Sequence, residues 1–320
     1  MKRLSAIFVT TFLAIISASN GTDAAKKENE LNPAEKWVVG RITAGEIANL
    51  SEQFPEERDR KLSAKFVQDL LTGNLTGVES HRNGVRIIGA VIVEPIDMSN
   101  GQIPWEVWLD HCQFSSAANF ERANCAGIVS FQDSTFEANA NFNGMQVGET
   151  ALFNKAVFKG WVDFGSADLA GHFYAIEAQF KDKVKGPRFE SMKVRGLAFF
   201  RKAEFEGWWV NFLLADFTRN FEAQGVKFTN GEWRVDFYGM KVGQIANFND
   251  AVFEGSVDFS WADIAGNFEA QRAQFKNTVV LVMNCGGKGD FTGAKFSGSA
   301  YFAKSTFLER AIKPISPVFG

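Results

Sequence analysis

Phenylalanine recurs along this chain at a nearly constant interval, which limits the folds open to it. Each unit closes with a small residue, one variable residue and a Phe, as in Ala156-Val157-Phe158. The steps between successive closing Phe residues are 22, 22, 22, 25, 23, 25, 22 and 21. A period of this length is typical of a solenoid, in which each unit buries its apolar face by stacking on its neighbours. The closing residues are Phe114, Phe136, Phe158, Phe180, Phe205, Phe228, Phe253, Phe275 and Phe296.

Within one unit, the apolar residues fall in pairs two positions apart, with five or six residues from one pair to the next. This spacing indicates extended backbone with both side chains on one face, because strand side chains alternate. Four such short faces in 22 residues predict a four-sided coil with a turn at each corner. Counting back from Phe158, the expected inward residues are Ala156, Phe153, Ala151, Val147, Met145, Phe142 and Ala140.

Several triplets resemble the Ala-(Asp/Asn)-Leu core of pentapeptide-repeat proteins. They are Ala167-Asp168-Leu169, Ala215-Asp216-Phe217 and Ala262-Asp263-Ile264, and Ala140-Asn141-Phe142 is similar to the Phe-centred variety of the motif. The resemblance covers roughly residues 85–307 and implies an all-β solenoid, a right-handed quadrilateral parallel β-helix. In the family, a strict coil consists of four segments of five residues each. Coils of this chain average about two residues more, so we expect small bulges or looser corners.

A longer repeat of two coils overlies the single coil. Coils closing at Phe158, Phe205 and Phe253 carry Ala followed two residues later by Phe, and the coils after them carry Phe followed by Ala. Protein interiors are close-packed, so two Phe side chains stacked on every face would overfill a narrow tube. We therefore expect large and small side chains to alternate along one face.

Both ends of the chain differ from the repeat. Met1-Lys2-Arg3 followed by the apolar run 4–18 is typical of a secretory signal peptide, with cleavage near Ser19 or Ala24. An uncleaved anchor is the alternative, although the run is short for a membrane span, and we expect no span in the mature chain. The expected organisation is a signal peptide (1–24), a linker and helical cap (25–83), a β-helix (84–307) and a C-terminal tail (308–320).

The expected cap rests on residues 61–73, where Leu62, Phe66 and Leu70 have helical spacing and Gly73 is placed to end a helix. A solenoid needs its open ends covered, so we expect a small N-terminal α-helical cap over a first coil that begins near Val85.

The sequence contains no recognisable catalytic or metal-binding pattern. Its three His residues are scattered, and no His/Cys pair has zinc-site spacing. We therefore predict no enzyme activity, no metal and no cofactor. The net charge of −3 gives no reason to expect a nucleic-acid partner. Cys112, Cys125 and Cys285 all fall on inward positions, and we prefer buried thiols to a disulfide.

One polar column precedes the inward Phe residues of successive coils. A functional interpretation is an edge that binds carbohydrate or calcium, or the paired carboxylates of a polysaccharide-cleaving β-helix. The structural interpretation, which we favour, is that these side chains bind backbone groups next to a corner. The column consists of Asn119, Asn141, Asp163, Asn211, Asp236 and Asp258, with Arg188 interrupting it.

Large apolar residues gather near one edge of about five consecutive coils, at positions that should face outward. A contiguous exposed apolar patch marks an interaction surface, and Trp is common among binding hot spots. The alternative is that the longer segments 181–188 and 229–233 fold over these residues and bury them. The predicted interaction surface consists of Trp161, Trp208, Trp209, Leu213, Leu214, Trp233 and Trp261.

These observations predict an exported, non-enzymatic scaffold or protein-interaction module. Its partner is an unidentified protein or a second copy of the chain, as in a homodimer. The alternative is a cell-envelope protein that binds or cleaves polysaccharide. The family resemblance also implies DNA mimicry against topoisomerases, but the export signal and the mixed surface charge speak against it.

Overall fold

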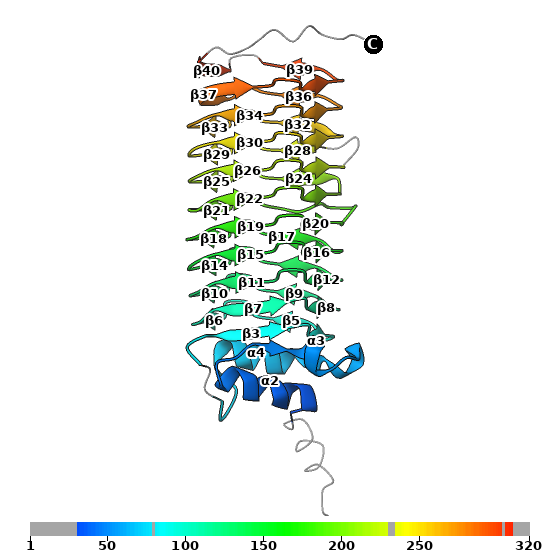
Figure 1. Ribbon diagram of the computed structural model, residues 1–320. Coiled ribbons are helices and arrows are strands. Elements are labelled where there is room, and N and C mark those ends of the chain that lie inside the picture. Colours follow the sequence, from blue (N-terminus) through cyan, green and yellow to red (C-terminus); the bar gives the residue numbers. More distant parts are fainter. Residues whose placement is uncertain (1–30, 79–80, 230–233, 303–304, 310–320) are drawn as a thin grey trace, which may run out of the picture.

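The computed structural model describes residues 31–78, 81–229, 234–302 and 305–309. Short parallel strands stack into a four-sided column that rises coil by coil from a helical N-terminal end (Figure 1). We name the four faces A, B, C and D in the order in which the chain visits them. The predicted four-sided parallel β-helix is confirmed.

Face A begins in the N-terminal region, because its first strand pairs with the first full coil. Its strands are β1 (Ala48–Asn49), β3 (Val85–Ile88), β7 (Val107–Asp110), β11 (Val129–Ser130), β15 (Ala151–Leu152), β19 (Phe173–Tyr174), β22 (Ala198–Phe199), β26 (Phe221–Glu222), β30 (Ala246–Asn247) and β34 (Phe268–Glu269). Face B is an 11-stranded sheet. It contains β2 (Lys61–Leu62), β4 (Val91–Ile92), β8 (Gln113–Phe114), β12 (Thr135–Phe136), β16 (Val157–Phe158), β20 (Gln179–Phe180), β23 (Glu204–Phe205), β27 (Lys227–Phe228), β31 (Val252–Phe253), β35 (Gln274–Phe275) and β38 (Lys295–Phe296).

Face C is divided into two sheets, which Arg188 joins through single bridges to Asp163 and Asn211. Its strands are β5 (Ile96–Asp97), β9 (Ala118–Asn119), β13 (Ala140–Asn141), β17 (Val162–Asp163), β24 (Trp209–Asn211), β28 (Arg234–Asp236), β32 (Ser256–Asp258), β36 (Val279–Val280) and β39 (Ala300–Tyr301). Face D contains β6 (Gln102–Ile103), β10 (Asn124–Cys125), β14 (Gln146–Val147), β18 (Asp168–Leu169), β21 (Lys193–Val194), β25 (Asp216–Phe217), β29 (Lys241–Val242), β33 (Asp263–Ile264), β37 (Asn284–Asp290), which continues onto face A, and β40 (Thr306–Glu309).

The interior is a continuous apolar core, and every inward residue predicted for the Phe158 coil is buried. On face B, successive Phe rings stack with centroids 4.6–5.2 Å apart from Phe114 to Phe296. On face C, a second stack runs from Phe120 to Phe259. Two Phe stacks therefore line two of the four faces.

Face A shows the predicted alternation of large and small side chains. Ala151 pairs with Phe173, which pairs with Ala198, and the same exchange continues to Phe268. Because faces B and C each carry a Phe in the coils where face A alternates, the remaining space on face A admits one further ring per coil. The Phe of face A therefore alternates between two inward positions that are two residues apart, from one coil to the next.

The corner turns follow a common pattern. In the A–B and C–D corners, a backbone N–H bonds to the carbonyl three residues earlier, as from Ala156 to Phe153, and the residue before the donor has positive φ. This is the geometry of a type II turn, which favours Gly or Asn at that position. Several corners use larger residues instead, including Lys155, Leu214 and Trp261, with φ of 55°, 55° and 60°.

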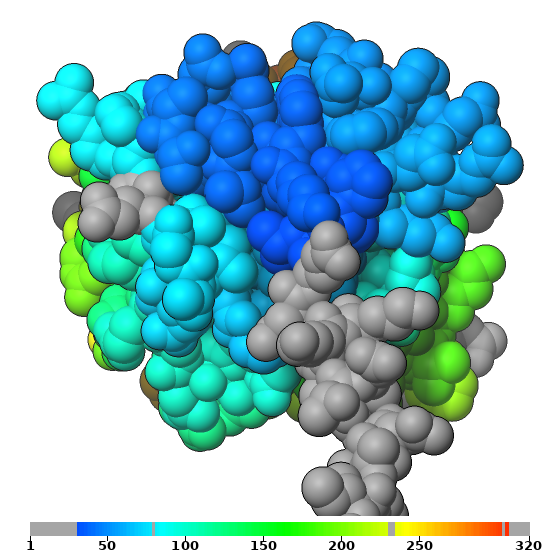
Figure 2. All heavy atoms as spheres, turned by 90° about the horizontal axis from the view of Figure 1, so that it is seen from below, coloured from blue at the N-terminus to red at the C-terminus, as the bar shows by residue number. Residues whose placement is uncertain are grey.

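In the described residues, three short helices lie at the N-terminal end of the column, where blue atoms cover much of the end seen from below in Figure 2. They are α2 (Pro33–Thr43), α3 (Leu50–Gln53) and α4 (Ala64–Thr72), with a 3₁₀ turn at Glu57–Asp59. Asn32 and Glu35 form a capping box at the start of α2, and the Glu35 carboxylate also accepts hydrogen bonds from Ser63. One acidic side chain thereby ties the start of α2 to the start of α4.

The predicted helix over residues 61–73 begins later than expected. Ser63 accepts a hydrogen bond from the Phe66 N–H, and Gly73, at φ 75°, ends the helix as predicted. Leu62 is buried but lies in β2, which pairs with β4, and β1 pairs in the same way with β3. The segment before Val85 thus contributes strands to faces A and B as well as helices, which the helical spacing alone did not predict.

Candidate functional site

The most distinctive surface feature is a groove on the outer side of face C. It lies beside β24 and β28, which Figure 1 labels. It has a volume of about 770 Å³. It is lined by Trp161, Trp208, Trp209 and the 184–186 segment, which we call its walls, and by polar residues, which we call its floor. Three of the residues predicted for the interaction surface therefore lie together. The polar floor consists of Arg188, Glu190, Asn211, Arg234 and Asp236.

The Trp side chains differ in exposure. The exposed fractions of Trp208 and Trp209 are 51% and 49%. Trp161 is half-buried, and the Lys185 ammonium lies 5.0 Å from its ring centroid, within the range of a cation–π contact. The segment 181–188 thus partly covers Trp161 but leaves the other two exposed, so neither of the two sequence alternatives describes all three residues.

The remaining predicted surface residues lie elsewhere. Leu213, which is half-buried, and Leu214 lie on the C–D corner, and Trp261 lies on the same corner two coils further on. Leu214 and Trp261 have exposed fractions of 55% and 70%, and neither lines the groove. Trp233 lies outside the described residues, as do residues 230–232 of the segment suggested to cover this surface. The predicted surface therefore divides into a groove and an exposed apolar corner.

Ion pairs organise the groove floor. Arg188 places Nη1 3.1 Å from Asp163 Oδ2 and Nε 3.0 Å from Glu190 Oε2. Arg234 places Nη2 2.8 Å from Asp236 Oδ2 and 2.9 Å from Asp258 Oδ2. Both guanidinium groups are half-exposed, whereas Asp163 and Asp236 are buried. Each Arg consequently pairs with carboxylates from two coils of face C.

The polar column has the structural role that we favoured. In all six residues, the side-chain oxygen accepts a hydrogen bond from the backbone N–H two residues later, at 2.6–3.2 Å. These are Asx turns at the C–D corner. Because Asn and Asp are equivalent acceptors for this bond, either residue type can occupy a position in the column. Arg188 replaces the acceptor in one coil and pairs with the carboxylate of the coil before it.

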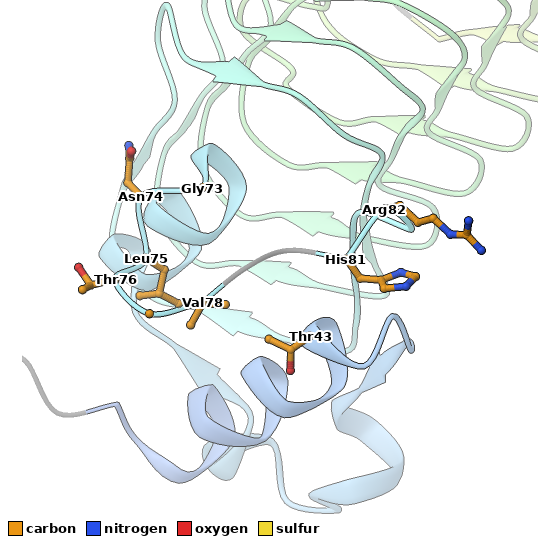
Figure 3. Close-up of a pocket in the computed structure, with 9 residues that line it drawn as sticks. Thr43, Gly73, Asn74, Leu75, Thr76, Val78, His81 and Arg82 are labelled. Carbon is orange, nitrogen blue, oxygen red and sulfur yellow. The ribbon is translucent and has the colours of Figure 1, made fainter.

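A second, more polar cavity lies between the helical end and the first coils (Figure 3). Its lining includes Thr43 from α2, the segment 73–78 and His81, while the Arg82 side chain extends away from the other sticks in the view. The described lining residues include no carboxylate and no thiol. We assign no chemistry to this cavity.

Face A carries an outward aromatic group that sequence reasoning missed. Tyr174 and Phe199 stack with centroids 4.8 Å apart, and the Arg201 guanidinium lies 5.1 Å from the Phe199 ring. Their positions directly follow inward residues in β19 and β22. The strict alternation of strand side chains was the signal that could have identified them.

The three cysteines are free and buried, as we preferred. Burial raises the pKa of Cys112 and of Cys125 to about 12, and it also raises the pKa of Cys285. Within the described residues, no group of three or more His, Cys, Asp or Glu side chains could hold a metal ion. In the same part of the chain, no helix combines the length and apolar character that crossing a bilayer requires.

The stack of four-sided coils defines a parallel β-solenoid. A family model for pentapeptide repeats, in nine copies, matches residues 237–281, which confirms the resemblance over that stretch. The described coils on both sides of the match have the same four faces. No curated protein and no solved structure matches the chain.

Proposed function

We propose that this protein is an exported, non-enzymatic scaffold that acts by binding a partner through face C. The observation that carries the proposal is the groove in which three Trp side chains stand around two ion-paired Arg residues. Fixed aromatic and Arg side chains are the residue types that dominate binding energy at interfaces. Pentapeptide-repeat proteins are generally interaction scaffolds, which supports the same function.

The polysaccharide-cleaving alternative loses support from the groove floor. Unpaired carboxylates facing the Trp side chains would have favoured a general acid and base. Instead, Asp163, Asp236 and Asp258 each accept a backbone N–H and lie beside an Arg. Binding without cleavage accounts for this arrangement with fewer assumptions.

Photo-crosslinking in the cell that makes the protein tests the binding surface. A photo-crosslinking amino acid replaces Trp209 in one variant and Gln274, an exposed residue of face B, in the matched control. We expect adducts from position 209 that exceed those from position 274. Equal yields at the two positions would contradict the assignment of the partner to face C.

Mass spectrometry of the purified protein tests export. We expect the extracytoplasmic fraction to contain a chain that begins after Ser19 or Ala24. A chain that retains Met1 and stays in the cytosol would overturn this part of the proposal. Light scattering of the same sample shows whether a second copy is the partner.

A further inference from the structure

The groove has a regular spacing along the column axis. Arg188 pairs with Asp163 on one side and with Asn211 on the other. Gly186 lies two residues before Arg188. In the same outward row, Trp161 lies two residues before Asp163, and Trp209 lies two residues before Asn211. Trp209 in turn pairs with Arg234 of the next coil. The row along the axis is therefore Trp, Gly, Trp, Arg in four consecutive coils.

Gly186 keeps the space between the two indoles open. It has φ of 78°, and a Cβ built on it would lie 2.6 Å from the Trp209 carbonyl oxygen. A side chain at this position would require both an unfavourable backbone conformation and a shift of β24. The row thus presents two indoles two coils apart, about 10 Å for strands spaced about 4.8 Å.

The groove offers both apolar surface and nearly balanced charge. Lys185, Arg188 and Arg234 line it together with Glu190 and Asp236. Each guanidinium has five N–H donors, and the ion pairs described above use only some of them. A polyanion would meet the carboxylates of the floor, whereas hydroxyl groups can pair with both the donors and the acceptors.

We propose that the groove binds an uncharged β-1,4-linked polysaccharide that runs along the column axis. In such an extended chain, each sugar is turned over relative to the one before, so the same ring face recurs at every second unit. The two indoles, two coils apart, match this recurrence. One sugar ring lies on Trp209, a second lies on the part of Trp161 that Lys185 leaves uncovered, and the hydroxyl groups lie on the polar floor. The inference rests on the proposed function and names the class of its partner.

Tryptophan fluorescence and calorimetry with defined oligosaccharides test the proposal on the full mature chain. The probes are cellobiose, cellotetraose, cellohexaose, the corresponding N-acetylglucosamine oligomers and an oligouronate of six units. We expect at least one neutral series to bind, with the tetramer at least about tenfold tighter than the dimer because it reaches both indoles. Failure of both neutral series, or preference for the oligouronate, would overturn the proposal.

Two matched variants locate the binding. Trp209→Ala should weaken binding of the hexamer at least about tenfold, equal to about 1.4 kcal/mol, whereas Trp209→Phe should retain most of it. Trp261→Ala, at a more exposed Trp outside the groove, should leave the affinity unchanged. Equal losses in Trp209→Ala and Trp261→Ala would contradict the groove as the site.

The crosslinking experiment separates this inference from the proposed function. After digestion, the peptide that contains position 209 should carry the mass of hexose or N-acetylhexosamine units. If it carries a peptide instead, the partner is a protein, so the scaffold function stands and the polysaccharide inference fails. If position 209 gives no more adduct than position 274, the proposed function itself fails.

Discussion

Replacing Phe212 by Ala removes one ring from the middle of the face C stack. The ring is fully buried and lies between Phe189 and Phe237, with centroid distances of 4.5 and 5.0 Å. It also has edge contacts with Phe200 and Phe221. A buried Phe→Ala change costs about 3–5 kcal/mol, and stacked neighbours add about 0.5–1.5 kcal/mol each beyond the buried area.

We expect the free energy of unfolding of Phe212→Ala to fall by about 4–5 kcal/mol, because rigid coils on both sides prevent the cavity from collapsing. Guanidinium titration followed by circular dichroism measures the change. Phe296→Ala is the matched control, since Phe296 is half-buried and has one stacked neighbour, Phe275. Its loss should be about 1–2 kcal/mol. A loss below about 1 kcal/mol for Phe212→Ala, or equal losses in the two variants, would refute the packing argument.

Three further predictions concern the groove, the corner turns and the thiols. Trp209→Ala should change the melting temperature little because the side chain is half-exposed; a fall of several degrees would show that it is packed. Asp163→Ala should cost about 1–3 kcal/mol by leaving a buried backbone N–H unpaired, whereas Asp163→Asn keeps the acceptor, and equal costs in denaturant titrations would argue against the Asx turn. Cys112 and Cys125 should resist a thiol reagent at pH 8 until denaturant is added. Because their folded pKa of about 12 exceeds the ordinary value of 9.0, the free energy of unfolding should fall as pH rises from about 9 towards 12, and a flat profile would contradict their burial.

The sequence predicted the interior of this molecule well because the interior repeats. Strand alternation assigns each position to the inside or the outside, and the equivalent positions of neighbouring coils repeat the assignment. A wrong assignment of Phe153 would therefore reappear at Phe200 and Phe248. The same argument predicted the backbone bonds of the polar column. These local features require no knowledge of distant contacts.

The surface was harder to predict because it depends on segments that do not repeat. The position of Lys185 over Trp161 follows from the path of one longer corner, residues 181–188. Leu214 and Trp261 occupy turn positions where φ is positive, and apolar residues of this size rarely mark such turns. The pairing of Leu62 with β4 was missed because two residues are too few to show a strand pattern.

The unequal coil lengths have a consequence for how such a protein can change. The coil that closes at Phe205 is three residues longer than those before it, yet Phe180 and Phe205 stack at 4.7 Å. The extra residues are accommodated at the B–C corner, outside the hydrogen-bonded faces. An insertion within a face would instead turn inward side chains outward. The outer edge of this column can therefore acquire or lose a binding surface without altering its interior, and recognition and folding can evolve separately.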